Sequence, residues 1–265
     1  MVAFVCSCSL PGDRYIWPWK GGGIPASFGV SWLMTNASSS FLVVKNNMLK
    51  HFLVISILFF FSLSNASPKY KENVKDADGN VYPTVKIGNQ IWMAKNYNLK
   101  LNGSWCYNND EKNCEIYGRL YTWSMVMNMP DSCNAKTCNS KTPKTHKGIC
   151  PEGFHVPFAW EYRTLYSYVR EKDYSPRVPP KLKSKTLWIA NNNGTDEFGF
   201  NALPAGSVSD VKIFNGLSMD AFFWTADESD NENAECFLID YMLDDGVECS
   251  PMKKRSGLSL RCIKD

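Results

Sequence analysis

The sequence predicts an α+β fold that is rich in strands and loops and is braced by disulfide bonds. Short β-branched and aromatic runs alternate with Asp-Gly, Gly-Asn and Asn-rich turns, and one segment has a clear helical period. Eight cysteines follow a predicted secretory leader, an arrangement typical of disulfide frameworks. With 44% hydrophobic and 14% aromatic residues in 265, the chain has enough apolar surface for a packed core.

The first 66 residues differ from the rest in composition. Residues 1–47 show neither helical nor strand periodicity, whereas residues 48–51 are a basic start followed by the apolar run 52–63 and small residues up to Ala66. This order is typical of a signal peptide, and the run is shorter than the roughly 20 residues that span a bilayer. We therefore expect a signal peptide at 48–66 and translation from Met48, with 1–47 a wrongly assigned N-terminal extension. An uncleaved membrane anchor is the alternative.

Removal of residues 1–66 leaves a chain without net charge. Four of the 29 basic residues and one of the 26 acidic residues lie in this leader, which leaves 25 of each. Such a balance provides no basic surface for nucleic acid, so no nucleic-acid partner is expected. We expect a secreted or cell-surface protein with no stable membrane span after signal cleavage.

The mature chain is expected to begin with a linker and a β-meander. Residues 67–75 are polar and lysine-rich, and we interpret them as a short linker. Asp78-Gly79 precedes the alternating residues 81–87 and predicts a hairpin turn. Gly88-Asn89 predicts a second turn before the apolar residues 91–93.

The remaining elements are one helix, several loops and further strands. After Pro157, apolar residues recur at spacings of three to five up to Val169, which predicts an amphipathic helix. Residues 117–127 are apolar and fit a strand or a buried helix equally well. The other expected elements are a loop at 131–145, a turn at 191–194 and strands at 222–224, 237–239 and 258–262.

The eight cysteines of the mature chain allow 105 pairings, and the sequence alone does not select one. Proximity across polar turns favours three local bridges and leaves two cysteines for a long-range bridge. The favoured pairs are Cys106–Cys114, Cys133–Cys138, Cys236–Cys249 and Cys150–Cys262. No Cys-x-x-Cys pair occurs, so a zinc–thiolate site is not expected.

Seven motifs in order carry a family resemblance. They are Asp76–Tyr82 (DADGNVY), Thr84–Met93 (TVKIGNQIWM), Tyr117–Trp123 (YGRLYTW), Cys150–Pro157 (CPEGFHVP), Phe198–Gly206 (FGFNALPAG), Phe223–Thr225 (FWT) and Arg261–Asp265 (RCIKD). They resemble the Fibrobacter succinogenes major paralogous domain, which we place at residues 76–265. The chain departs from the family pattern after Pro157, where Phe158-Ala-Trp160-Glu161 replaces Ser/Thr-Asp-x-Glu-Trp, and at Thr225-Ala226, where the family has Ser-Ser.

The resemblance implies a single C-type-lectin-like domain, similar also to the formylglycine-generating enzyme family, in a secreted or surface protein. It brings no settled biochemical activity, because sites and not folds carry function. Formylglycine-generating enzymes use a paired active-site cysteine. All eight cysteines here have structural partners in the favoured pairing, so that activity is not expected.

Two tryptophans are candidates for stacking on a ligand. Trp92, Trp123 and Trp224 lie among apolar residues, and we assign them to the core. Trp105 and Trp188 lie beside polar turns, so we expect them to be exposed and to bind ligand. A core position is the alternative for both.

The acidic segment 227–235 offers oxygen ligands for calcium. The candidate ligands are Asp227, Glu228, Asp230 and Glu232. The sugar-binding triplets Glu-Pro-Asn and Gln-Pro-Asp of calcium-dependent lectins do not occur in the sequence. A solvated acidic loop is therefore favoured over a calcium site, and no other cofactor is expected.

No catalytic residue is expected. His155 lies between two apolar residues and has no visible acid–base partner, and no Gly-x-Ser-x-Gly, His-Glu-x-x-His, P-loop or dinucleotide motif occurs.

The expected function is a non-catalytic binding or adhesion module whose partner is a polysaccharide or another cell-surface component. The alternatives are an extracellular carbohydrate-active or protein-modifying enzyme, and a structural surface component.

Overall fold

The computed structural model describes residues 70–138, 146–173, 177–242 and 247–265, and every structural statement below concerns these residues. They belong to one compact unit that extends from Ser64 to Asp265. The predicted extension 1–47, the signal peptide 48–66 and residues 67–69 lie outside the described residues.

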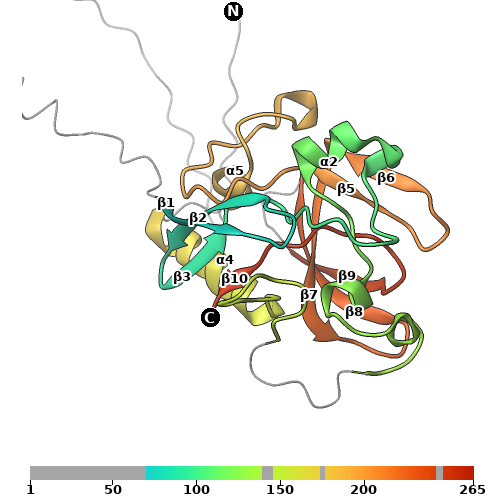
Figure 1. Cartoon of the computed structure of the whole chain (residues 1–265). Coiled ribbons are helices and arrows are strands. Elements are labelled where there is room, and N and C mark those ends of the chain that lie inside the picture. The colour runs from blue at the N-terminus through green and yellow to red at the C-terminus, as the bar shows by residue number, and fades with distance from the viewer. Residues whose placement is uncertain (1–69, 139–145, 174–176, 243–246) are drawn as a thin grey trace, which may run out of the picture. The chain divides into compact units, whose positions relative to one another are not determined.

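The first sheet brings the two ends of the domain together (Figure 1). Its five antiparallel strands have the order β1-β2-β3-β10-β4. They are β1 (Tyr70–Lys75), β2 (Val81–Ile87), β3 (Gln90–Met93), β10 (Ile263–Lys264) and β4 (Phe154–His155). The C-terminal strand β10 thus lies between β3 and β4, so strands from both ends of the domain belong to one sheet.

Both predicted turns join strands of this sheet, but the predicted linker is wrong for residues 70–75. These residues form β1 and pair with β2, because Asp76 reverses the chain immediately after them. The Asp76 carboxylate accepts hydrogen bonds from the N–H groups of Asp78 and Asn80, an Asx turn, and Gly79 takes a positive φ of 85°. Polar, lysine-rich composition here marks an edge strand of the sheet.

The second sheet has the order β6-β5-β7-β8-β9. Its strands are β5 (Ala205–Val208), β6 (Phe214–Leu217), β7 (Asp220–Glu228), β8 (Asn233–Asp240) and β9 (Val247–Lys253). The predicted strands at 222–224 and 237–239 lie within β7 and β8. Residues 258–262 form no regular strand, because they cross between the sheets and make single bridges, Leu258 to Tyr121 and Ser259 to Phe223.

The predicted helix is α4 (Ala159–Asp173), which packs against β7 and β8. Its shorter companions are α2 (Glu111–Tyr117), α3 (Trp123–Val126), α5 (Pro179–Leu182) and the 3-10 turns η1 (Tyr107–Asn109), η2 (Asp131–Asn134) and η3 (Ile189–Asn191). The ambiguous segment 117–127 therefore ends in the short helix α3. The predicted loop 131–145 begins with η2, and its residues 139–145 lie outside the described part. Within the described ranges, no helix has the length and apolar character needed to cross a bilayer.

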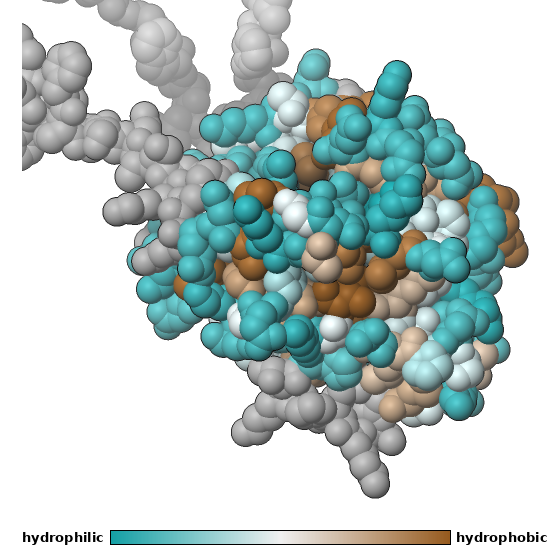
Figure 2. All heavy atoms as spheres, in the orientation of Figure 1, coloured by the Kyte–Doolittle hydropathy of each residue, from teal (hydrophilic) through white to brown (hydrophobic). Residues whose placement is uncertain are grey.

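Aromatic side chains dominate the core between α4 and the sheets. Tyr162 stacks on Phe237, with ring centroids 4.5 Å apart and an interplanar angle of 11°. Trp92, Trp123 and Trp224 are fully buried, which confirms their assignment to the core. On the face shown in Figure 2 hydrophilic residues predominate, and hydrophobic residues form a patch near its centre and smaller patches elsewhere.

Four disulfides brace the domain, and they join the same pairs that proximity along the sequence favours. Three of them close short segments, with sequence separations of 5, 8 and 13 residues. Cys150–Cys262 spans 112 residues and fixes the segment before β4 to the segment before β10. In the chain-entropy model a loop of this length contributes on the order of 4–5 kcal/mol. The fold is thus a disulfide-braced α+β domain.

Candidate ligand-binding sites

Trp188 is a core residue, so its predicted exposure is wrong. Only 5% of its surface is accessible, and its indole N–H donates to the Ser184 hydroxyl at 3.1 Å and to the Ala202 carbonyl at 3.3 Å. The Asn193 side chain, in the polar turn that follows, accepts a hydrogen bond from the backbone N–H of Trp188 at 3.0 Å, and the Lys183 ammonium lies 4.5 Å from the centroid of the Trp188 ring. Neighbouring polar residues in the sequence therefore did not imply an open ring.

Trp105 is half-buried, and its ring is also occupied by neighbours. The Lys212 ammonium lies 4.2 Å from the ring centroid, and a Cβ on Gly257 would lie 2.9 Å from Cε3 of the ring. The Trp105 N–H donates to the Leu120 carbonyl. These contacts restrict the part of the Trp105 ring that a ligand can reach, so the ring is less exposed than predicted.

The most exposed tryptophan of the described residues is Trp160, with 54% of its surface accessible. Tyr162, Leu165 and Val169 form the buried face of α4. At about 100° per residue, Trp160 lies on the opposite face of the helix. Helical spacing in the sequence already indicates that Trp160 lies on the exposed face of α4. The prediction of Trp105 and Trp188 as the exposed tryptophans did not use this signal.

A groove of about 350 Å³ lies between α4 and the β2–β3 turn, and its helix wall begins about one turn after Trp160, which does not itself line the groove. We call it the helix groove. Its helix wall consists of polar-face residues that follow Trp160 at helical spacing, and its other wall is the turn. The lining residues are Ile87, Gly88, Asn89, Gln90, Arg163, Thr164, Ser167, Tyr168 and Glu171.

The two walls of the helix groove are fixed to each other. The Gln90 side chain donates to the Glu161 carbonyl at 2.9 Å, which ties the turn to α4. Gly88 packs on the Tyr168 ring so closely that a Cβ there would lie 2.9 Å from Cδ2, and its φ is +61°. The groove is therefore preformed, which lowers the entropic cost of binding.

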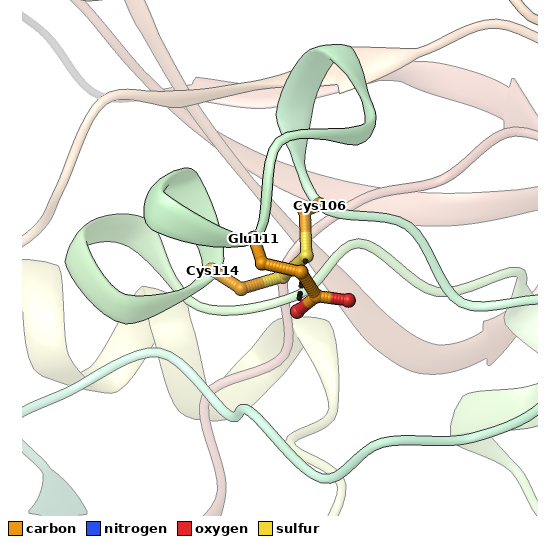
Figure 3. Close-up of side chains that lie close together, drawn as sticks. All are labelled: Cys106, Glu111 and Cys114. Carbon is orange, nitrogen blue, oxygen red and sulfur yellow. Dashed lines mark hydrogen bonds between the residues drawn. A yellow bond between two sulfur atoms is a disulfide. The ribbon is translucent and has the colours of Figure 1, made fainter.

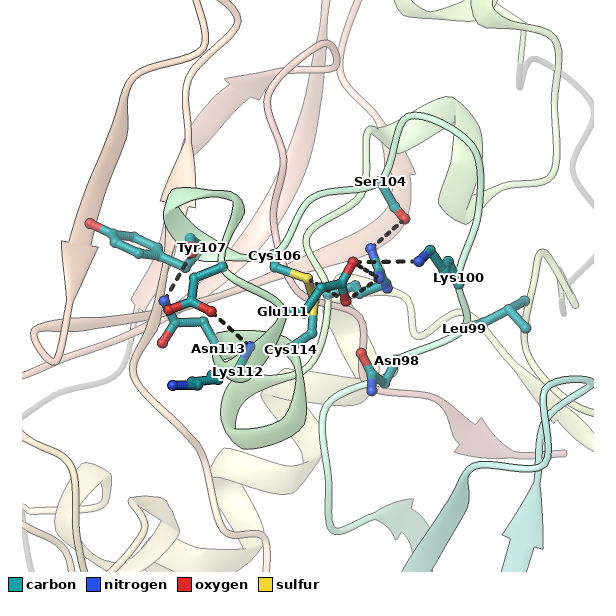
Figure 4. Close-up of a disulfide and its surroundings, with 12 residues drawn as sticks. Asn98, Leu99, Lys100, Ser104, Cys106, Tyr107, Glu111, Lys112, Asn113 and Cys114 are labelled. Carbon is teal, nitrogen blue, oxygen red and sulfur yellow. Dashed lines mark hydrogen bonds and ion pairs between the residues drawn. A yellow bond between two sulfur atoms is a disulfide. The ribbon is translucent and has the colours of Figure 1, made fainter.

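A second hollow of about 270 Å³ lies at the other end of β2. We call it the amide cleft, because three asparagines line it. Figure 4 shows Asn98 on the loop beside the Cys106–Cys114 disulfide. The lining residues are Asn80, Val81, Tyr82, Lys95, Asn96, Asn98, Cys114, Glu115, Ile116, Gly118 and Leu203.

The acidic segment does not gather its carboxylates at one point. Asp227 accepts a hydrogen bond from the Ala159 N–H, and Asp230 accepts from the N–H groups of Glu232 and Asn233. The partners of the other two carboxylates are Cys138 N–H and Lys254 for Glu228, and Lys253 for Glu232. Among the described residues, these four do not form a group with ligand atoms within 4.8 Å of one another, so the calcium-site alternative lacks its converging ligands.

One group of metal-ligand type does converge within 4.8 Å in the described ranges: Cys106, Glu111 and Cys114 (Figure 3). The two sulfurs form a disulfide, so the 3.3 Å contact of Cys106 Sγ with Glu111 involves a sulfur that carries no proton. Glu111 pairs with Arg119 at 2.8 Å and with Lys100 at 3.5 Å (Figure 4). Burial opposes its charge, but these two cations hold the pKa of Glu111 below its ordinary value. With the two cysteines joined in a disulfide, the three residues stabilise the local structure and are not arranged as metal ligands.

His155 is buried and bridges two carboxylates, partners that the sequence did not reveal. Its Nδ1 lies 2.7 Å from Asp265 and its Nε2 lies 3.1 Å from Glu161. Burial opposes the charged imidazolium, but the two carboxylates raise the pKa of His155 above its ordinary value. Both ring nitrogens are engaged, so His155 links β4, the start of α4 and the C-terminal residue.

The architecture described above defines a disulfide-braced α+β domain that carries the helix groove and the amide cleft on its surface. Residues 85–264, more than half of the chain, match the model of the Fibrobacter succinogenes major domain family, and the chain belongs to this family. No curated protein and no solved structure shows a significant match.

Proposed function

We propose that this protein is a non-catalytic glycan-binding module of the cell surface, which holds a polysaccharide along the helix groove. Trp160 is the observation that carries the proposal, because its large aromatic ring is 54% exposed on the same face of α4 that one turn later forms the wall of the groove. The partner is a polysaccharide or another glycan-bearing surface component.

The chemistry of the groove suits a neutral sugar chain. Sugars present apolar C–H faces to aromatic rings and hydroxyl groups to polar side chains. Trp160 offers such a ring, while Thr164, Ser167 and Glu171 continue along the same helix face with hydroxyl and carboxylate groups. From residue 160 to 171 the helix rises about 16 Å, enough for a chain of several sugar units.

The proposal includes a C-type-lectin-like fold and secretion. Pairing of the N-terminal strands with the C-terminal strand, and a long-range disulfide at the same place, support the lectin-like assignment. Four disulfides support an oxidising compartment outside the cytosol.

A glycan array followed by calorimetry on the purified domain tests the proposal. Trp160→Ala is expected to weaken binding at least about tenfold, the equivalent of about 1.4 kcal/mol, whereas Trp160→Phe retains part of it. Val211→Ala is the matched control, because Val211 is 69% exposed and does not line the groove. Unchanged glycan affinity in Trp160→Ala would contradict the proposed site.

A further inference from the structure

We propose that the amide cleft is a second ligand site, which takes a secondary amide carrying a small aliphatic group, such as the acetamido group of an N-acetylated sugar. The inference is independent of glycan binding at the helix groove. The two hollows lie at opposite ends of β2, about 20 Å apart at the rise of a strand.

The first step in the argument is an unsatisfied acceptor. Asn98 Oδ1 is buried and has no hydrogen-bond partner within the described part of the chain, and Asn98 lines the cleft. A buried acceptor without a donor is costly, and buried polar groups in proteins nearly always find a partner. A ligand N–H placed in the cleft supplies the missing donor.

The second step is that the backbone of Asn98 is held in place. Its N–H donates to the Tyr82 hydroxyl at 2.9 Å, and its carbonyl accepts from the Asn80 side chain at 3.4 Å. Tyr82 and Asn80 both donate to the carboxylate of Asp76, at 2.6 and 2.8 Å. The Asx turn before β2 thus fixes the backbone that carries the acceptor before a ligand arrives, which favours binding.

The remaining lining residues select the rest of the ligand. Lys95 is exposed at the cleft and provides an ammonium donor for a ligand carbonyl. Val81 and Ile116 are 42% and 47% exposed, and their aliphatic side chains offer contact to a methyl group. An N–H donor, a carbonyl acceptor and a methyl group are the three parts of an acetamido group.

The same chemistry occurs in a peptide, so the probes must separate the two sources. N,N′-diacetylchitobiose presents the acetamido group on a sugar, N-acetylalanine N′-methylamide presents it on a peptide, and cellobiose lacks it. We expect diacetylchitobiose to bind by calorimetry and cellobiose not to enter this cleft. Binding of the peptide analogue alone supports the cleft as an amide site and assigns a peptide as its source.

Three variants localise the binding. Asn98→Leu removes the acceptor at similar volume, and Ile116→Ser removes aliphatic contact from the exposed rim. Each of these two substitutions is expected to weaken amide binding at least about tenfold. Trp160→Ala is expected to leave it unchanged, so failure of the two sites is distinguishable. Thermal melting shows that each variant is folded. Absence of binding by both amide probes, or unchanged affinity in a folded Asn98→Leu, overturns the inference.

Discussion

The carboxylate of Asp227, on β7, caps helix α4 by accepting a hydrogen bond of 2.6 Å from the backbone N–H of Ala159. The family pattern has Ser/Thr-Asp at residues 158 and 159, where this chain has Phe158 and Ala159. Glu161 also reaches back to the Phe158 N–H at 2.9 Å. Two acidic side chains, one of them from another element, therefore satisfy the free N–H groups at the helix start.

Asp227→Ala is expected to destabilise the fold by about 0.5–2 kcal/mol, the usual cost of a lost helix cap. Asp227→Asn retains an acceptor and is expected to cost less. Chemical denaturation measures both, with Glu197→Ala as an exposed acidic control. Equal stability of Asp227→Ala and the control would show that the cap contributes nothing.

Calcium is expected to have no specific effect on stability. The four acidic side chains of the candidate calcium site bond to different protein groups, and calcium needs 6–8 oxygens around one point. Melting curves in calcium, in magnesium at equal ionic strength and in chelator should coincide. A rise of several degrees with calcium alone would refute this expectation, because ligand binding stabilises the native state.

Asp220 and Asp240 face each other across β7 and β8, and burial together with the charge of Asp240 raises the pKa of Asp220 to about 6. The unfolded chain has the ordinary aspartate pKa of about 3.9, so the folded state binds the proton more tightly. The resulting stabilisation is complete below about pH 4 and is lost as pH rises through about 6.

Asp220→Asn removes this titration while it keeps a similar shape. At pH 7 we expect the variant to be more stable than the wild type by about 1 kcal/mol, after allowance for solvent screening at this half-buried site. At pH 4 the advantage should vanish. Denaturation midpoints from pH 4 to 8 measure the effect, and a constant difference across this range would exclude the carboxyl pair as its source.

The long-range disulfide is expected to contribute more stability than a local one. Loop closure over 112 residues rather than 8 adds about 2 kcal/mol in the chain-entropy model. Paired Cys→Ala variants, at 150 with 262 and at 106 with 114, avoid free thiols. Denaturation of both variants tests the ranking, and a larger loss from the local pair would contradict it.

Trp188→Ala is expected to cost about 3–5 kcal/mol, because the ring is buried and hydrogen-bonded. Trp160→Ala should change stability by less than about 0.5 kcal/mol, as exposed substitutions usually do. Thermal unfolding separates the two. Comparable losses would mean that Trp160 packs in the core.

Local features of the fold followed directly from the sequence. The turns at Asp78-Gly79 and Gly88-Asn89, the helix after Pro157 and the three short-range disulfides depend on residues close in the chain, so turn chemistry and helical spacing sufficed to predict them. The apolar setting of Trp92, Trp123 and Trp224 likewise placed them in the core.

Tertiary structure alone decided which aromatic side chains are exposed and which polar groups have hydrogen-bond partners. Trp188 is buried and donates its indole N–H to Ser184 and Ala202, and Asp227 accepts a hydrogen bond from a helix start 68 residues earlier in the chain. Within the described part of the chain Asn98 Oδ1 has no hydrogen-bond partner, while the Asn98 backbone N–H is held by Tyr82, which in turn donates to Asp76. Exposure and hydrogen-bond satisfaction depend on contacts between distant segments, which composition and spacing along one chain do not encode.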